Sequence, residues 1–135
     1  MKILVEDHTA DVILSVEASS LEDIIWGLIK GVSEYYWGFS VPEKCKEETV
    51  KISLSGDGPD MTYAIATLLS DLIYAMESKR VVPCKLAAIE YKREQEMVYI
   101  DVQGFFYKGD YIPKGEEIKG VSFSVDWKVS IILDL

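Results

Sequence analysis

Two segments in the first half of the chain alternate apolar and polar residues, and this alternation predicts strands. In residues 12–18, Val12, Leu14 and Val16 occupy every second position, and residues 50–55 repeat the pattern with Lys or Ser between the apolar residues. Successive side chains of a strand point to opposite faces of a sheet. Each segment is therefore predicted to have one buried face and one wet face.

Apolar residues at steps of three and four predict two amphipathic helices. The first set is Leu21, Ile24, Ile25, Leu28, Ile29 and Val32. The second set is Met61, Ile65, Leu68, Leu69, Leu72, Ile73 and Met76. Ser19 and Glu22 have the spacing of a capping box before the first helix, and Asp60 is a candidate N-cap for the second. Residues 56–60 contain two glycines, two aspartates and a proline, a composition that indicates a turn.

A cluster of aromatic residues follows the first helical pattern. It consists of Tyr35, Tyr36, Trp37 and Phe39. Aromatic side chains supply large apolar surfaces, so a cluster here can close the core or form a platform for a ligand. We interpret it as closing the core at the helix end.

The second half of the chain predicts four more strands. Residues 81–92 and 97–107 are expected to pair across the charged turn 93–96, and a loop follows at 107–116. Residues 118–124 and 127–133 are the last two predicted strands, and Met1 to Val5 is a short apolar lead-in to the sheet. This order predicts an α+β fold in which two helices pack on one face of a largely antiparallel sheet. We expect a single domain over residues 1–135.

The composition is that of an ordinary soluble globular protein, with 49% hydrophobic and 27% charged residues. No apolar run is long enough for a membrane span, and the N-terminus does not have the pattern of a signal peptide. Cys45 and Cys84 are far apart and form no CxxC pair, so two reduced cysteines are expected. These features predict a cytoplasmic protein without a membrane partner.

The net charge of −9 is concentrated in the first 78 residues, which contain 5 basic and 14 acidic residues. The remaining residues contain 9 of each sign. Nucleic-acid binding through phosphates needs clustered Lys and Arg, so little direct binding of nucleic acid is expected. Such a chain is better suited to a cation or to a basic patch on another protein.

The candidate chemistry lies in residues 7–11, which contain Asp7, Asp11 and the one histidine of the sequence, His8. No G-x-S-x-G segment presents a serine nucleophile to His8, and no signature supports a cysteine nucleophile. We interpret His8 as a hydrogen-bonding loop residue. An acid–base pair formed by Asp7 and Asp11 stays open, although acids at such junctions often only cap turns. No catalytic residue is predicted.

Asp134 stands one residue before the end of the chain, where the carboxylate of Leu135 adds a second acid. If these two groups meet Asp11, three carboxylates lie within a few ångströms, and like charges raise one another's pKa. A hard divalent cation such as Ca²⁺ or Mg²⁺ would relieve this repulsion with oxygen ligands, whereas zinc or copper would recruit His or Cys. The alternative is three solvated acids.

Three segments resemble the archease family, and the likeness spans nearly the whole chain. Residues 8–12 (HTADV) resemble its HTAD motif, residues 117–123 (EIKGVSF) resemble its second conserved segment, and residues 132–135 (ILDL) resemble its closing strand. The second segment departs from the family pattern, because Gly120, Ser122 and Ser124 replace Ala, Thr and His. The final hairpin is also shorter than usual, and equal shortening of both arms would still return Asp134 to the side where Ile118 begins.

The resemblance implies a small cytosolic accessory protein that is not itself an enzyme. Archeases assist the RtcB-type RNA ligase of tRNA splicing by promoting its guanylylation and multiple turnover, and some are described as chaperones of RNA-modifying enzymes. The family's metal site, carried over to this chain, comprises Asp11, Asp134 and Leu135, with Ca²⁺ favoured over Mg²⁺. Two other functions stay open: a small carboxylate-metal-dependent hydrolase, and a diverged protein-interaction module.

Overall fold

The computed structural model describes residues 2–7, 11–41, 45, 48–108, 120–125 and 129–134. For residues 6, 7, 11–13, 120–125 and 129–134 it describes the backbone alone. The elements in chain order are β1 (Lys2–Asp7), β2 (Asp11–Glu17), α1 (Leu21–Trp37), β3 (Thr49–Gly58), α2 (Met61–Lys79), β4 (Val81–Glu94), β5 (Met97–Lys108), β6 (Gly120–Val125) and β7 (Val129–Asp134).

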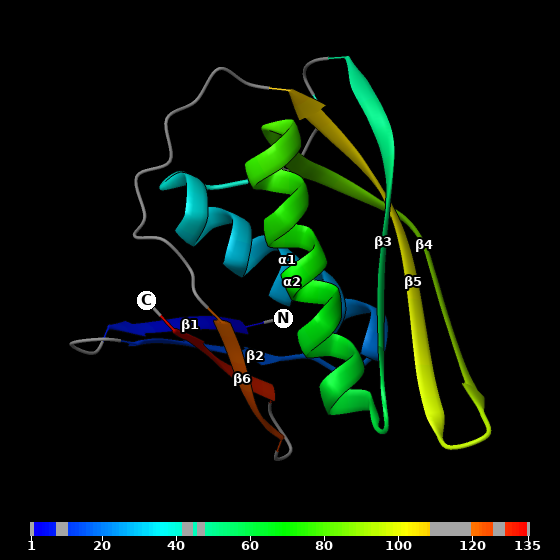
Figure 1. The fold of residues 1–135 in the computed structure, drawn as a ribbon. Coiled ribbons are helices and arrows are strands. Elements are labelled where there is room, and N and C mark those ends of the chain that lie inside the picture. The colour runs from blue at the N-terminus through cyan, green and yellow to red at the C-terminus, as the bar shows by residue number, and fades with distance from the viewer. Residues whose placement is uncertain are drawn as a thin grey trace.

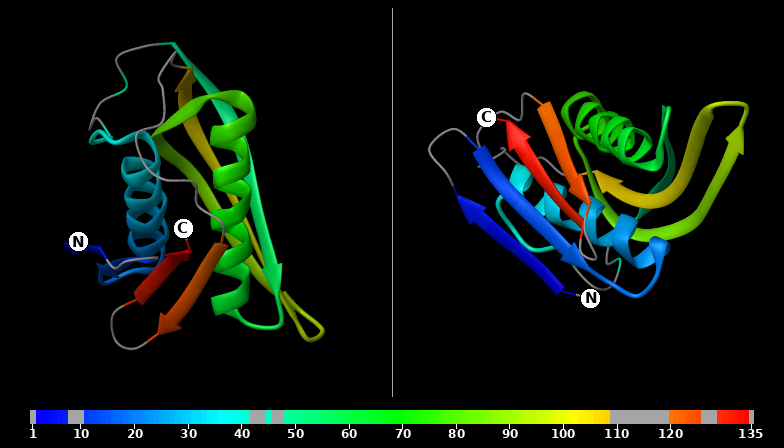
Figure 2. Two further views of the ribbon diagram at one scale, coloured as in Figure 1. Left: turned by 60° about the vertical axis from the view of Figure 1, so that its left-hand side comes forward. Right: turned by 90° about the horizontal axis from the view of Figure 1, so that it is seen from below.

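The strands form two antiparallel sheets with both helices between them (Figures 1 and 2). One sheet has the order β1-β2-β7-β6 and the other has the order β3-β5-β4. The predicted α+β class with two helices and antiparallel strands is confirmed. The strands are divided between two sheets rather than joined in one, since an alternating pattern predicts a half-buried strand without naming the strand that it pairs with.

Both helices begin at a polar residue whose side chain accepts a backbone hydrogen bond. Asp60 caps α2 as predicted, and its Oδ1 accepts from the Tyr63 amide at 2.9 Å. The cap of α1 is Ser20, whose Oγ accepts from the Asp23 amide at 3.2 Å, so the predicted Ser19–Glu22 box is displaced by one residue. Either serine offers the same hydroxyl acceptor, and only the backbone geometry distinguishes them.

The glycines of residues 56–60 extend a strand instead of making a turn, because β3 continues through Gly58. A Cβ atom on Gly56 would clash with the carbonyl oxygen of Ala64 and lie 2.7 Å from the amide nitrogen of Leu68. Glycine at this position therefore lets α2 approach the backbone of β3. The predicted turn is wrong for residues 56–58 for this reason.

The side of β3 that does not pair with β5 is hydrogen-bonded by side chains of α2. The amide of Ser55 donates to Asp71 Oδ2 at 2.9 Å, and the amide of Asp57 donates to Thr67 Oγ1 at 2.8 Å. The Thr67 hydroxyl also donates to the Asp57 carbonyl oxygen at 3.0 Å. These bonds satisfy backbone groups that an edge strand would otherwise leave to solvent.

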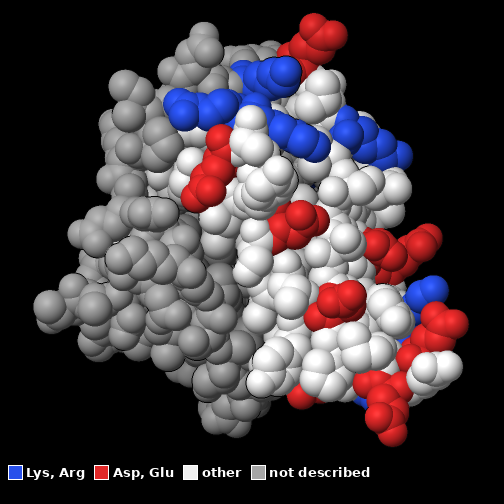
Figure 3. All heavy atoms as spheres, in the orientation of Figure 1, with Lys and Arg blue, Asp and Glu red and all other residues white. Residues whose placement is uncertain are grey.

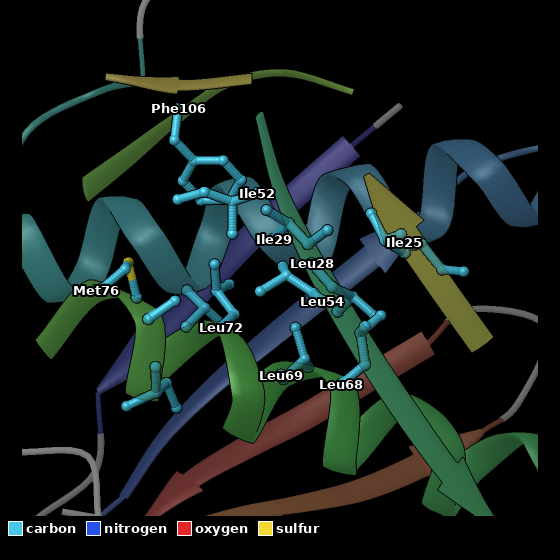
Figure 4. Packing of buried hydrophobic residues seen from close by; sticks show 14 of the residues in the cluster. Ile25, Leu28, Ile29, Ile52, Leu54, Leu68, Leu69, Leu72, Met76 and Phe106 are labelled. Carbon is cyan, nitrogen blue, oxygen red and sulfur yellow. The ribbon is translucent and has the colours of Figure 1, made fainter. Parts of the chain in front are cut away.

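Buried side chains from both helices and both sheets form one core (Figure 4). The largest fully buried ones are Trp37, Phe106, Leu14, Ile25, Leu28, Ile29, Leu54, Leu68, Leu69, Leu72, Met76 and Ile100. Leu14 and Val16 show which face of β2 packs against the helices, because both are buried in this cluster. That assignment fixes the two faces of the four-stranded sheet.

A disulfide joins Cys45 to Cys84, so the expectation of two reduced cysteines is wrong. The two Cα atoms are 5.6 Å apart, within the range that a disulfide requires. Cys84 is only 3% exposed and lies in β4, where the register with β5 shifts between Pro83 and Lys85. The two cysteines are 39 residues apart in the sequence, and spacing of this length does not predict which cysteines meet.

Candidate functional site

Strand pairing places Asp11 and Asp134 directly opposite each other. Asp11 is the first residue of β2 and Asp134 is the last residue of β7, and the two strands pair without a shift as far as Val16 and Val129. In Figure 2, β7 lies between β2 and β6, so the two extremities of the chain meet inside one sheet.

Positions 11 and 134 belong to the outer face of the four-stranded sheet, which we define as positions 11, 13, 15 and 17 of β2 and the positions paired with them. The alternation of a strand assigns these positions to the face opposite Leu14 and Val16, which are buried against the helices. Directly opposed residues share a face, and their Cβ atoms are about 4.5–5.5 Å apart. Two acidic residues are thus neighbours on a face that the helices do not cover.

Asp134 has a second neighbour, Gly120, at the start of β6. The β6–β7 hairpin keeps one register from Gly120 and Asp134 to Val125 and Val129. The expectation that Asp134 returns to the beginning of the preceding strand is therefore confirmed for residues 120–134, although Ile118 lies outside the described residues. Gly120 contributes no side chain beside the aspartate pair.

The other candidate residues of the sequence analysis are Leu135, His8 and Asp7. Leu135 and His8 lie outside the described residues. Asp7 pairs with Val12 across β1 and β2, so positions 7 and 11 fall on opposite faces of the sheet. This arrangement counts against an acid–base pair formed by Asp7 and Asp11.

The three-stranded sheet carries a separate hollow of about 460 Å³, which sequence patterns do not predict. It is lined by Ile89, Glu90, Tyr91, Lys92, Tyr99 and Asp101. The Lys92 ammonium lies 3.4 Å from Glu94 Oε2 and 5.5 Å from the centroid of the Tyr99 ring. The lining includes no histidine, cysteine or serine.

Among the residues that Figure 3 colours, Lys and Arg do not form a broad cationic face. Most of the Lys and Arg side chains in this view gather at the end of the molecule where α2 ends, and Asp and Glu side chains are spread over the rest of the coloured surface. Among the residues whose side chains are described, which do not include Asp11, Asp134 or Leu135, no three His, Cys, Asp or Glu side chains could hold a metal ion.

The aromatic cluster closes the core, as predicted. Tyr36 and Trp37 are 7% and 1% exposed, and their rings meet edge to face with centroids 4.8 Å apart. Burial raises the pKa of Tyr36, the nearby carboxylate of Glu77 raises it further, and the Arg80 guanidinium opposes both effects. The cluster therefore has a structural role at the junction of α1 with the second sheet.

The sequence matches the model of the Archease protein family (MTH1598/TM1083) over residues 5–135. The chain belongs to the archease family. Membership of this family supports an accessory role in general terms.

Among solved structures, this archease is similar to protein 1598 of Methanobacterium thermoautotrophicum, determined in solution. The TM-score is 0.66 with 16% sequence identity, and the match covers 98% of each chain. At this identity the likeness establishes the fold alone. No curated protein matches the sequence.

No helix in the described part of this archease is long and apolar enough to cross a membrane.

Proposed function

We propose that this archease is a metal-binding accessory protein of an RtcB-type RNA ligase, and that it promotes guanylylation and turnover of the ligase in tRNA splicing. Family membership supports an accessory role, and the pairing of Asp11 with Asp134 supports the metal site. The pairing is the observation on which the proposal depends, because it joins two residues 123 positions apart at one end of a sheet.

The proposed ligands are the carboxylates of Asp11 and Asp134 and the main-chain carboxylate of Leu135. The terminal carboxylate belongs to the backbone, so it can serve whichever way the Leu135 side chain points. Carboxylate oxygens suit hard cations, and Ca²⁺ accepts irregular sites that water completes, whereas Mg²⁺ demands near-octahedral geometry. We therefore expect Ca²⁺ to bind more tightly than Mg²⁺ at this open strand end.

The proposed contribution to the ligase is an acidic surface, ordered by the metal, that contacts the partner near its active site. Positions 11 and 134 lie on the face of the four-stranded sheet opposite Leu14 and Val16, and we propose that the partner binds on this side. The formal charge of −9 makes direct RNA binding unfavourable and favours a protein partner. When bound, the metal would supply charge neutralisation and orientation of the carboxylates.

The test compares Asp11→Asn with Glu17→Gln, since both residues lie in β2 and only the first belongs to the proposed site. Both substitutions remove one negative charge. We expect Asp11→Asn to abolish stimulation of multiple turnover by the purified ligase and to weaken Ca²⁺ binding, measured by calorimetry, more than tenfold.

The control variant Glu17→Gln should retain both properties. Equal stimulation by wild type and Asp11→Asn would contradict the proposal. Hydrolysis of nucleotides or phosphoesters by the purified archease alone would favour a metal-dependent hydrolase instead.

A further inference from the structure

The strand β1 lies at the edge of the four-stranded sheet, with β2 as its single neighbour among the described strands. Two apolar residues at its centre are exposed: Leu4 by 45% and Val5 by 48%. An edge strand presents unpaired amide and carbonyl groups, and exposed apolar residues on it favour pairing with another strand.

The sequence of β1 can pair with its own copy. Both copies of an antiparallel pair present the same alternate residues to the shared edge, so the two-fold axis must pass through a residue and not between two residues. An axis through Leu4 pairs Lys2 with Glu6, Ile3 with Val5, and Leu4 with its own copy. In this register, residues of opposite charge pair at both ends of the two strands, and apolar residues pair in the middle.

The neighbouring registers lack this complementarity. An axis through Val5 would oppose Leu4 to Glu6 and Ile3 to Asp7, and an axis through Ile3 would oppose Lys2 to Leu4. Opposite-charge pairs and apolar pairs each stabilise a sheet, whereas a charge opposed to an apolar residue gains neither term. Complementarity therefore selects the axis through Leu4.

We propose that two copies of this archease associate through β1 about a two-fold axis at Leu4, which joins their four-stranded sheets into one continuous sheet. An isologous contact of this kind closes on itself and gives a dimer rather than a polymer. The paired strands are short and bury less area than the roughly 1,600 Å² of a typical stable interface. The dimer should therefore be weak and depend on concentration.

The proposed dimer leaves the Asp11–Asp134 pair free. Asp7 ends β1 beside Val12, so the aspartate pair lies at that end of the sheet, whereas Lys2 and Glu17 mark the other end. The two-fold axis directs the two copies of the aspartate pair toward opposite ends of the joined sheet. Each copy can then engage its own partner, and the dimer does not rest on the proposed function.

The experiment uses sedimentation equilibrium of the full chain over a wide concentration range. Wild type should shift from the 15.2 kDa of one chain toward twice that mass as its concentration rises. Leu4→Lys and Leu4→Glu should each stay monomeric, because each places like charges against each other at the axis. An equimolar mixture of these two variants should form the heterodimer, since Lys then opposes Glu.

Val50→Lys is the matched control, because Val50 is 44% exposed and lies on β3 of the other sheet. This variant should dimerise like wild type, and far-UV circular dichroism checks that every variant is folded. Amide exchange of wild type needs no substitution: amides of β1 at the free edge should become protected as concentration rises.

Three results would overturn the proposal. They are a wild-type chain that stays monomeric at every concentration, a mixture of Leu4→Lys with Leu4→Glu that forms no heterodimer, and β1 amides whose exchange is independent of concentration.

Discussion

The indole Nε1 of Trp37 donates a hydrogen bond to the carbonyl oxygen of Val81 at 3.2 Å, and so joins the end of α1 to the start of β4. The Arg80 guanidinium lies 5.8 Å from the centroid of the same ring. Both partners come from the segment that follows α2, so one side chain connects both helices with the three-stranded sheet.

Trp37→Phe should destabilise the protein by about 1–3 kcal/mol, because it leaves a buried carbonyl oxygen without its donor and removes buried apolar surface. Urea unfolding followed by circular dichroism would measure the loss. Tyr74→Phe is the control, since Tyr74 is 67% exposed and its substitution should change the free energy of unfolding by less than about 0.5 kcal/mol. Similar midpoints for both variants would show that the bond contributes little.

Gly56→Ala should destabilise the protein by about 1–3 kcal/mol, because the added methyl group would force α2 away from β3. Thermal unfolding would detect the change as a lower Tm. Ser53→Ala, three residues earlier on the exposed face of β3, should leave the Tm nearly unchanged. An unaltered Tm for Gly56→Ala would mean that the close approach of α2 is dispensable.

Removing the disulfide by Cys45→Ser with Cys84→Ser should lower the free energy of unfolding by about 4 kcal/mol, the loop-closure value for two cysteines 39 residues apart. Dithiothreitol should lower the Tm of wild type and leave that of the double variant unchanged. Mass spectrometry after thiol alkylation reports whether the bond is present in the purified protein. Two alkylated thiols in an unreduced sample would contradict the pairing.

Ionisation of Tyr36 should lower the free energy of unfolding at alkaline pH. Burial and Glu77 raise the pKa of Tyr36 in the folded state. The neutral phenol therefore stabilises the fold fully below the unfolded pKa of about 10, and this contribution is lost as pH rises through the folded pKa. Urea titrations at neutral pH and above pH 10 should show a smaller alkaline loss for Tyr36→Phe than for wild type, and equal losses would exclude the role of Tyr36.

The proposed cation site predicts that Asp11→Asn stabilises the protein without divalent cations and makes it relatively less stable with Ca²⁺. Without divalent cations the variant should be more stable than wild type by about 0.2–1 kcal/mol, because Asp11 then no longer repels Asp134. With saturating Ca²⁺, wild type should gain stability by mass action and the variant should gain less. Thermal unfolding in chelator and in Ca²⁺ measures both effects, and a wild-type Tm that ignores Ca²⁺ would count against the site.

Local patterns predicted the helices, the strands and the cap at Asp60, because each depends on residues close together in the sequence. The Cys45–Cys84 bond and the division into two sheets depend on contacts between distant segments, which no local period contains. Gly56 was misinterpreted for a related reason: a glycine that permits close packing and a glycine that makes a turn look alike in sequence.

The candidate site was predicted only in part from the sequence. The pairing of Asp11 with Asp134 was expected from the resemblance of both chain ends to archease segments, and the strand register now provides it. The hollow near Tyr99 was not predicted from the sequence. Four of its lining residues, Glu90, Lys92, Tyr99 and Asp101, meet on one face only through the exact register of β4 with β5.

The hydrogen bonds from β3 to Thr67 and Asp71 have a consequence for the partly unfolded protein. If α2 detaches, it uncovers the amides of Ser55 and Asp57 on a strand of 10 residues, together with the apolar residues that the helix covered. Such an intermediate would expose an unpaired strand edge and an apolar surface, and both can bind other unfolded chains. Heating should therefore end in aggregation, with the first precipitate appearing when α2 loosens rather than when the last strand melts.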